Sequence, residues 1–320
     1  MVVPAHLVAD DKEIRDMRPE TKASTVIPAK AGIHCCAADA AEGGIKACGA
    51  IDPRLRGDDG GGKISVIIPF WNTEKYIAAT LKCVAAQTYE NLEVILVSDC
   101  PTDGTEKIAA EFAARDPRFK LIRNEKNMDL AISRNRGVAA ACGDYIHFMD
   151  ADDLISPDFY EVMLNAAREN DADVAACCAF YEKKPWKSIW FQRPEVLRET
   201  NEKIRKTLVT VQGWAWRYLI RREFWNAHGF EFPSLRPLED MPAMIPMVYY
   251  ANRIALCPDA VYFYKHREGS IINQARDPEK QKRYHENRTK ARAMFRGFMR
   301  EHNIKAPNRL WQSIKRRFFL

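Results

Sequence analysis

From residue 63 onward, short apolar runs alternate along the chain with segments whose apolar residues recur every three or four positions. Short apolar runs are typical of buried strands, whereas the longer repeat is typical of amphipathic helices. The runs that predict strands cover residues 64–69, 92–97, 119–122, 145–149 and 174–180. The segments that predict helices cover residues 77–85, 106–114, 132–141 and 157–170. This alternation predicts an α/β fold with a mostly parallel central sheet flanked by helices.

Composition divides the chain into three parts. In residues 1–62, proline, glycine, alanine and charged residues are mixed without a helical or strand period, which predicts a poorly ordered leader outside the folded domain. Residues 63–275 carry the alternating pattern, which is regular over 63–180 and looser over 181–275. Residues 276–320 form a basic C-terminal extension, which we expect to be helical.

Several classes of protein are excluded by composition and motifs. No apolar stretch of membrane-spanning length occurs and no secretory signal opens the chain, so we expect a cytoplasmic protein. The nine cysteines show no paired spacing typical of a disulfide framework or a zinc site. A glycine-rich dinucleotide fingerprint is missing after the first predicted strand, which argues against a dehydrogenase.

The basic charge is concentrated in the C-terminal extension. The chain carries a net charge of +6, and residues 280–320 alone hold 13 Lys and Arg against Glu286 and Glu301. Aromatic residues are interleaved with this charge, which predicts peripheral contact with the anionic inner face of the cytoplasmic membrane. The alternatives are a solvated helical face and nucleic-acid binding. We expect no nucleic-acid partner, because no binding motif accompanies the charge.

The fourth predicted strand ends in three carboxylates. Asp150 and Asp152 flank Ala151, and alternate residues of a strand share one face, so both side chains should project together from its C-terminal edge. Like charges that close repel each other, and a divalent cation is the simplest compensation. Mg²⁺ or Mn²⁺ bound by one or two carboxylates usually completes its shell with water and phosphate oxygens, which indicates a nucleotide diphosphate. The alternative is that these residues only end the strand and cap the next helix, as Asp153 could.

Ligands of open parallel sheets bind beyond the carboxyl ends of the strands. Three groups lie at these positions: residues 69–72, 98–99 and 150–152. Together with the segment 133–137, the longer segments around them, 67–72, 98–105 and 148–153, resemble family 2 glycosyltransferases with the GT-A fold. The resemblance covers about residues 63–270 and depends on the order and spacing of the four segments.

This resemblance implies transfer of a sugar from a nucleotide-sugar donor, commonly a UDP-sugar, with inversion at the anomeric carbon. The acceptor would be a hydroxyl of a bacterial surface glycan or glycolipid, and the enzyme a hexosyl- or N-acetylhexosaminyl-transferase. Residues 63–180 would form the nucleotide-binding half and residues 181–275 the acceptor half.

The family's site residues carry over onto matching positions of this chain. Asp99 would bind the base, Asp150 the ribose, and Asp152 a Mg²⁺ or Mn²⁺ ion on the diphosphate. The residues expected to bind the donor are Pro69, Phe70, Asn72, Asp99, Arg134, Asp150, Ala151 and Asp152. Arg134 could clamp a phosphate or pair with surface carboxylates instead.

Inversion in one displacement requires a base that takes the proton of the acceptor hydroxyl. Asp240, next to Glu239 at the predicted start of a helix, is similar to the acidic residue in this role in the family. The alternative for Asp240 is a helix cap, which Pro242 just inside the helix makes credible. Trp214 and Trp216 could stack on sugar rings, but we expect them to be core residues.

Two other functions share parts of this pattern. A sugar nucleotidyltransferase would need a glycine-rich basic loop after the first strand to hold a triphosphate, and residues 69–74 contain no such loop. A non-catalytic sugar-nucleotide or glycan-binding protein would bind the donor without turning it over.

Overall fold

A computed structural model describes residues 62–235, 238–266 and 278–304. The predicted leader, apart from residue 62, lies outside the described residues. So does the end of the basic extension, from residue 305 onward.

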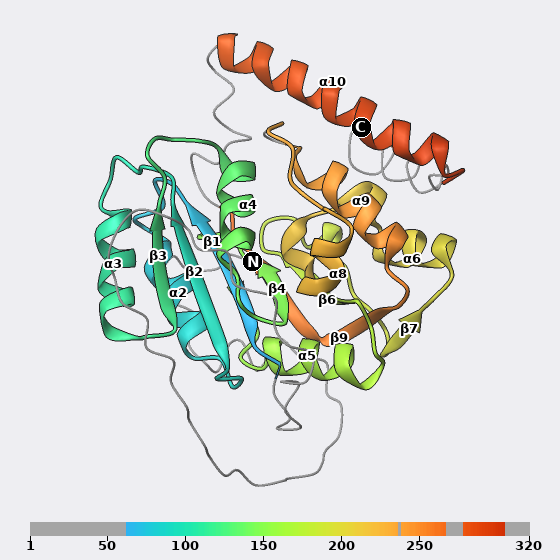
Figure 1. Ribbon diagram of the computed structural model, residues 1–320, viewed down its shortest axis with the longest axis horizontal. Coiled ribbons are helices and arrows are strands. Elements are labelled where there is room, and N and C mark those ends of the chain that lie inside the picture. Colours follow the sequence, from blue (N-terminus) through green and yellow to red (C-terminus); the bar gives the residue numbers. More distant parts are fainter. Residues whose placement is uncertain (1–61, 236–237, 267–277, 305–320) are drawn as a thin grey trace, which may run out of the picture. The chain divides into compact units, whose positions relative to one another are not determined.

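The first half of the fold is a parallel sheet with crossover helices (Figure 1). Its strands lie in the order β3-β2-β1-β4, and all their pairings are parallel. These strands are β1 (Ile64–Phe70), β2 (Leu92–Ser98), β3 (Phe119–Arg123) and β4 (Tyr145–Phe148). The connecting helices are α2 (Ile77–Ala85), α3 (Thr105–Arg115) and α4 (Leu130–Ala140). The alternation predicted from the apolar pattern is confirmed, and strand and helix ends differ from it by at most two residues.

The second half extends the same sheet with strands of both directions. Strand β8 runs antiparallel to β4 and β6, while β6 and β9 are parallel to each other. Short strands β5 and β7 pair antiparallel with β9. The bounds are β5 (Leu154–Ile155), β6 (Val174–Tyr181), β7 (Glu195–Leu197), β8 (Tyr218–Arg221) and β9 (Ile254–Tyr264). The remaining helices are α5 (Phe159–Glu169), α6 (Thr200–Thr207), α7 (Val209–Gln212), α8 (Arg222–Ala227), α9 (Asp240–Tyr250) and α10 (Pro278–Glu301).

The core has two layers, one on each face of the sheet. Every residue of β1 is buried, and its side chains alternate between the layers. Val66 and Ile68 pack in the layer that contains α2, α3 and α5, whereas Ile67 packs with α4 and α9 on the opposite face. Helix α4 approaches β1 closely at Gly137, where an added Cβ would lie 2.3 Å from Cγ2 of Ile67. A strand buried on both faces explains the continuous apolar runs in the sequence.

Helix α10 packs against α9 through aromatic and aliphatic contacts (Figure 1). The Phe298 ring lies 5.4 Å from that of Tyr249 and 5.9 Å from that of Tyr250, centroid to centroid. Met299 is buried in the layer of the core that contains α9. The expected helix of the C-terminal extension is therefore present over Pro278–Glu301 and packs on α9. Within the described ranges, no helix is both long and apolar enough to cross a bilayer.

Candidate active site

A cavity of about 370 Å³ opens beyond the carboxyl ends of β1, β2 and β4. The chain adds β2 and β3 on one side of β1 and then returns to place β4 on the other side. At such a reversal the loops after neighbouring strands diverge, and the crevice between them is the usual ligand site of an open parallel sheet. Pro69 and Phe70 end β1, Asp99 follows β2, and Asp150 follows β4, so these side chains meet at the cavity.

Of the eight residues predicted to bind the donor, seven line this cavity and Asn72 does not. The backbone of Asn72 is left-handed, with a φ of 49°. Its Oδ1 accepts a hydrogen bond of 2.7 Å from the backbone N–H of Thr102, and its Nδ2 donates one of 3.0 Å to the Thr102 hydroxyl. Asn72 therefore links the loops that follow β1 and β2 instead of lining the cavity.

Asp99 is held in one orientation by three donors. Its carboxylate accepts hydrogen bonds from Nδ2 of Asn124 at 2.7 Å, the N–H of Met128 at 2.7 Å and the N–H of Asp129 at 3.2 Å. The side chain is buried, and yet the residue lines the cavity wall. Such fixed acceptors are suited to reading hydrogen-bond donors of a ligand.

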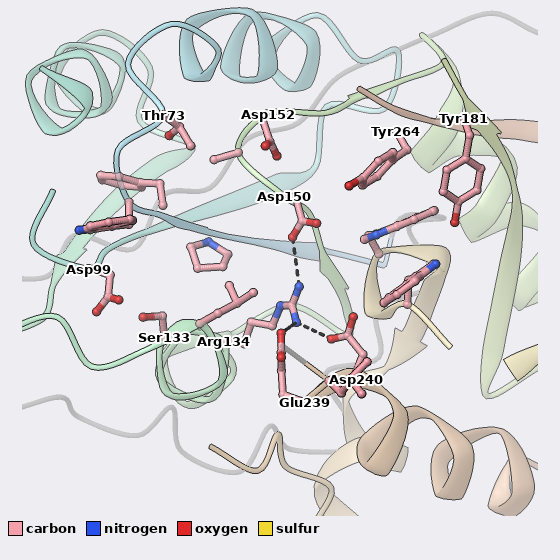
Figure 2. A pocket seen from close by; sticks show the side chains of 18 of the residues that line it. Thr73, Asp99, Ser133, Arg134, Asp150, Asp152, Tyr181, Glu239, Asp240 and Tyr264 are labelled. Carbon is pink, nitrogen blue, oxygen red and sulfur yellow. Dashed lines mark hydrogen bonds and ion pairs between the residues drawn. The ribbon is translucent and has the colours of Figure 1, made fainter. Parts of the chain in front are cut away.

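Asp150 and Asp152 lie in a turn, because β4 ends at Phe148. The expected alternation along a strand is therefore wrong for these residues, although both line the cavity (Figure 2). The backbone N–H of Asp150 donates to the hydroxyl of Tyr262 at 3.1 Å, which ties the turn to β9.

Asp153 supports this turn and does not cap a helix. Its buried carboxylate accepts hydrogen bonds from the Tyr262 hydroxyl at 2.9 Å and from the N–H of Lys265 at 2.7 Å. Helix α5 instead has Asp158 at its N-cap position. Burial, together with Asp152 and Asp150, raises the pKa of Asp153 well above its usual value.

The centre of the site is an arginine that contacts three carboxylates (Figure 2). Arg134 projects from α4 and is only 2% exposed. Its Nη1 contacts Asp240 and lies 3.2 Å from Glu239, while its Nη2 donates to Asp150 at 3.1 Å. The partners of Arg134 are thus buried or half-buried, and the surface pairing considered from the sequence is wrong.

Burial and crowding control the protonation of this cluster. Burial, followed by the charge of Asp240, raises the pKa of Glu239 to about 7. Burial also raises the pKa of Asp240, and the positive charge of Arg134 opposes that rise. Burial would lower the pKa of Arg134, but its three carboxylate partners hold that pKa above the usual value. Arg134 therefore remains charged and favours the ionised form of Asp240.

Asp240 begins α9, but its side chain does not act as a helix cap. Glu239 occupies the N-cap position and makes no capping hydrogen bond with its side chain. The carboxylate of Asp240 instead faces Arg134 at the cavity. The arrangement supplies a buried carboxylate of raised pKa beside a ligand cavity, which is the usual setting of a general base.

The wall of the cavity opposite Asp99 is aromatic, as Tyr181 and Tyr264 show (Figure 2). The ring centroid of Trp216 lies 6.3 Å from that of Tyr181 and 6.2 Å from that of Tyr264. Trp214 and Tyr284 also line the cavity. Trp216 is 2% exposed and stacks on Tyr262 with ring centroids 4.2 Å apart, so its expected place in the core is confirmed. Trp214 is half-buried and packs against the core.

Sequence reasoning missed several residues of this wall, including Lys184 and Lys187. Residues 182–194 have neither a strand nor a helix period, so no pattern predicts which side chains face a cavity. In the sequence Tyr284 belongs only to the basic extension. It lines the cavity in the structure, where it is part of α10, the helix that packs against α9.

The fold agrees with comparisons with known proteins. Residues 65–227, about half of the chain, match the family model of Glycosyl transferase family 2. EpsJ of Bacillus subtilis (strain 168), described as a glycosyltransferase, is 30% identical over 236 residues, which cover 69% of this chain and 67% of EpsJ. The glycosyltransferase GlyG of Streptococcus pneumoniae serotype 4 is 28% identical over 220 residues, which cover 65% of this chain and 72% of GlyG.

Among solved structures, S. aureus TarS (residues 1–349, with UDP-GlcNAc) has a TM-score of 0.58 and 22% sequence identity, and the match covers 77% of each chain. That likeness concerns the fold, which is the GT-A fold. The relatives favour sugar transfer over nucleotidyl transfer and over simple binding. The chain belongs to glycosyl transferase family 2 and is a glycosyltransferase.

Proposed function

We propose that the enzyme transfers a sugar from a UDP-sugar to a hydroxyl of a bacterial surface glycan, with inversion and with the help of Mg²⁺ or Mn²⁺. The observation that carries this proposal is the gathering of Asp99, Asp150, Asp152 and Asp240 around one cavity at the reversal point of the sheet. The TarS protein with the same fold was crystallised with UDP-GlcNAc, which is a donor of the class proposed here.

In this proposal the donor lies across the ends of β1, β2 and β4. The base contacts Asp99 beside Pro69 and Phe70, and the ribose hydroxyls donate to Asp150. The diphosphate then lies near Ala151 and Asp152, where the turn after β4 lines the cavity.

Asp152 is the proposed ligand of the cation. Within residues 62–235, 238–266 and 278–304, no cluster of three His, Cys, Asp or Glu side chains could hold a metal by itself. Mg²⁺ and Mn²⁺ do not need such a cluster, because one or two carboxylates plus phosphate oxygens and water complete their shells. The carboxylate side chains at the cavity therefore fit a cation that binds together with the nucleotide-sugar donor. When bound, the cation would stabilise the negative charge that develops on the departing diphosphate.

Asp240 is the proposed general base. It takes the proton from the acceptor hydroxyl while the acceptor oxygen forms a bond to the anomeric carbon and the bond to the diphosphate oxygen breaks. Attack from the side opposite the leaving group inverts the anomeric carbon. Arg134 holds the Asp240 carboxylate in place and favours its ionised form, as its direct contact and charge indicate.

Replacing Asp152 by asparagine tests the role of the cation. The change preserves the size of the side chain but removes its charge, so we expect metal-dependent hydrolysis of the donor to fall by about 10²- to 10³-fold. The measurement is the rate of UDP release from UDP-sugars against Mn²⁺ concentration, without acceptor. The same substitution at Asp259, which is exposed on β9 and does not line the cavity, should leave the rate unchanged. Unchanged metal dependence in the Asp152→Asn variant would contradict the assignment.

We also propose that α10 holds the enzyme on the inner face of the cytoplasmic membrane. Arg288, Arg292 and Arg296 follow one another at intervals of four residues, so they share one face of the helix. Burial lowers the pKa of Arg292, and the positive charges of Arg288 and Arg296 lower it further, which is consistent with the proximity of the three arginines. Exposed Met294 adds an apolar side chain between them in sequence. An anionic lipid surface would relieve the repulsion among the arginines.

Flotation with lipid vesicles measures this contact. We expect the protein to float with vesicles that contain phosphatidylglycerol and to lose that binding when all three arginines are replaced by glutamine. Lys75, Lys82 and Lys107, exposed on or next to α2 and α3, provide a control with the same loss of charge. Equal binding by the two triple variants would show that overall charge, and not α10, determines the contact.

A further inference from the structure

The wall of the cavity opposite Asp99 carries two lysines that the proposed donor does not use. Figure 2 shows Asp99 and Tyr181 on opposite sides of the site, with Asp150 and Arg134 between them. Lys184 and Lys187 line the cavity and follow Tyr181 in the chain. If the donor's base lies at Asp99, as the proposed function has it, the acceptor must enter on the side of Tyr181.

The segment that carries these lysines is fixed to the wall. The N–H of Lys184 donates to the carbonyl oxygen of Tyr181 at 3.1 Å. Nε2 of Gln212 donates to the carbonyl oxygen of Lys187 at 3.1 Å, and the Tyr181 hydroxyl donates to Oε1 of Gln212 at 3.2 Å. A short 3₁₀ helix over Pro185–Lys187 spans the distance between the two lysines. Their positions at the cavity therefore depend on defined contacts and not on a free loop.

The positive charge of this segment is not neutralised by the part of the chain that the structure describes. There, no carboxylate forms an ion pair with Lys184 or Lys187, whereas the nearby Lys265 pairs with Glu182 at 3.2 Å. Burial lowers the pKa of Lys187, and the charge of Lys184 lowers it further. The carboxylates Glu239 and Asp240 in the cavity face Arg134 instead. Two ammonium groups that repel each other, one on exposed Lys184 and one on half-buried Lys187, favour a negatively charged ligand.

The same wall also offers surfaces for a sugar. Trp214, Tyr264 and Tyr284 are half-buried aromatic residues that line the cavity, whereas Trp216 is buried and stacks on Tyr262. Aromatic rings bury the apolar C–H faces of a ligand and leave its polar edges free for hydrogen bonds. Aromatic residues and lysines together suit a ligand that is both a carbohydrate and an anion.

We propose that the acceptor of this enzyme is an anionic glycan, whose sugar ring lies against the aromatic wall and whose negative group contacts Lys184 and Lys187. The negative group is a carboxylate of an acidic sugar or a phosphate of a lipid-linked sugar. This inference depends on the proposed function for the direction in which the donor lies and for the UDP and Mn²⁺ that fill the donor site in the test.

Equilibrium binding of matched probes tests the proposal. The enzyme is first saturated with UDP and Mn²⁺, and three probes are then titrated: a neutral methyl disaccharide, the same disaccharide oxidised to a uronate, and a monosaccharide linked to farnesyl diphosphate. We expect at least one anionic probe to bind more tightly than the neutral one and to weaken as salt is added. Tighter binding of the uronate would indicate an acidic sugar, and binding of the diphosphate probe alone a lipid-linked acceptor.

Variants of the lysines separate this role from others. The double variant Lys184→Gln/Lys187→Gln should bind the anionic probe about tenfold or more weakly than the wild type and bind the neutral probe with unchanged affinity. Lys183→Gln removes a neighbouring exposed lysine that does not line the cavity and should change nothing. Lys187→Arg keeps the charge and should retain most of the binding. Thermal melting of each variant confirms that it is folded.

Three results would overturn the proposal. The first is that the anionic probes bind no better than the neutral one, and the second is that Lys183→Gln loses as much affinity for the anionic probe as the double variant does. The third is weaker binding of UDP in the double variant. The last result would assign the lysines to the donor. Hydrolysis of UDP-sugars without acceptor tests the proposed function separately, because it requires neither lysine. An enzyme that hydrolyses the donor but does not discriminate by charge would therefore refute this inference alone.

Discussion

Replacing Asp240 by asparagine is expected to lower the rate of sugar transfer by about 10²- to 10⁴-fold, the usual contribution of a general base. The amide is nearly the same size but cannot take the proton of the acceptor hydroxyl. Binding of the donor should change little, because Asp99 and Asp152 contact it in the proposed arrangement. The measurements are the transfer rate at saturating substrates and the dissociation constant of UDP with Mn²⁺.

The pH dependence of transfer provides a second readout of the Asp240→Asn variant. A base works in its ionised form, so activity must fall as the pH drops through its pKa. Burial raises the pKa of Asp240, with Arg134 opposing, so the acidic limb of the profile should lie above that of an ordinary aspartate. The limb should disappear in the variant. Glu231→Gln, an exposed control before α9, should retain both rate and profile. A variant with most of the wild-type rate would exclude Asp240 as the base.

Replacing Arg134 by methionine is expected to have the largest effect on stability. The change removes the cation from between Asp150, Glu239 and Asp240 and leaves their charges uncompensated in a mostly buried site. Removing one partner of a buried ion pair costs about 3–5 kcal/mol in the free energy of unfolding. Transfer should also be lost, because Asp240 loses its positioning contact. Urea denaturation measures the first effect and the transfer assay the second.

Acidification should partly restore the stability of the Arg134→Met variant. Without the arginine, the pKa values of Glu239 and Asp240 in the folded protein, which burial already raises, rise further above those in the unfolded chain. Such groups stabilise the fold when protonated, and this contribution is lost as the pH rises through the folded pKa. The variant should therefore gain stability relative to the wild type between about pH 8 and pH 5. Adding Glu239→Gln should restore part of the loss at neutral pH.

Arg115→Met is the matched control for this experiment. Arg115 lies on α3 with its side chain 80% exposed and 3.9 Å from Glu111. An exposed pair contributes only about 0–1 kcal/mol, so the control should unfold almost like the wild type. If the two variants were equally stable, the carboxylate cluster would not depend on Arg134.

The parallel half of the fold could be predicted because its information is local. Each residue of β1 is buried, so the strand appears as an unbroken apolar run, and the face of α2 appears as the buried residues Ile77, Leu81 and Val84. The order of strands along the chain then places Asp99 and Asp150 at one edge of the sheet. The antiparallel β8 could not be predicted, because its four residues carry no period that distinguishes a strand.

The amino-acid sequence by itself determined the alternating elements, the family and the segments after β1, β2 and β4 that line one side of the cavity, since each depends on residues close together in the chain. Only the tertiary structure decided how those side chains pair. Arg134 and Asp240 are 106 positions apart, and their contact arises from the packing of α4 and α9 on one face of the sheet. The same is true of Tyr284, which α10 brings to the cavity. Charge pairing and cavity walls depend on distances in space, and no local pattern records those distances.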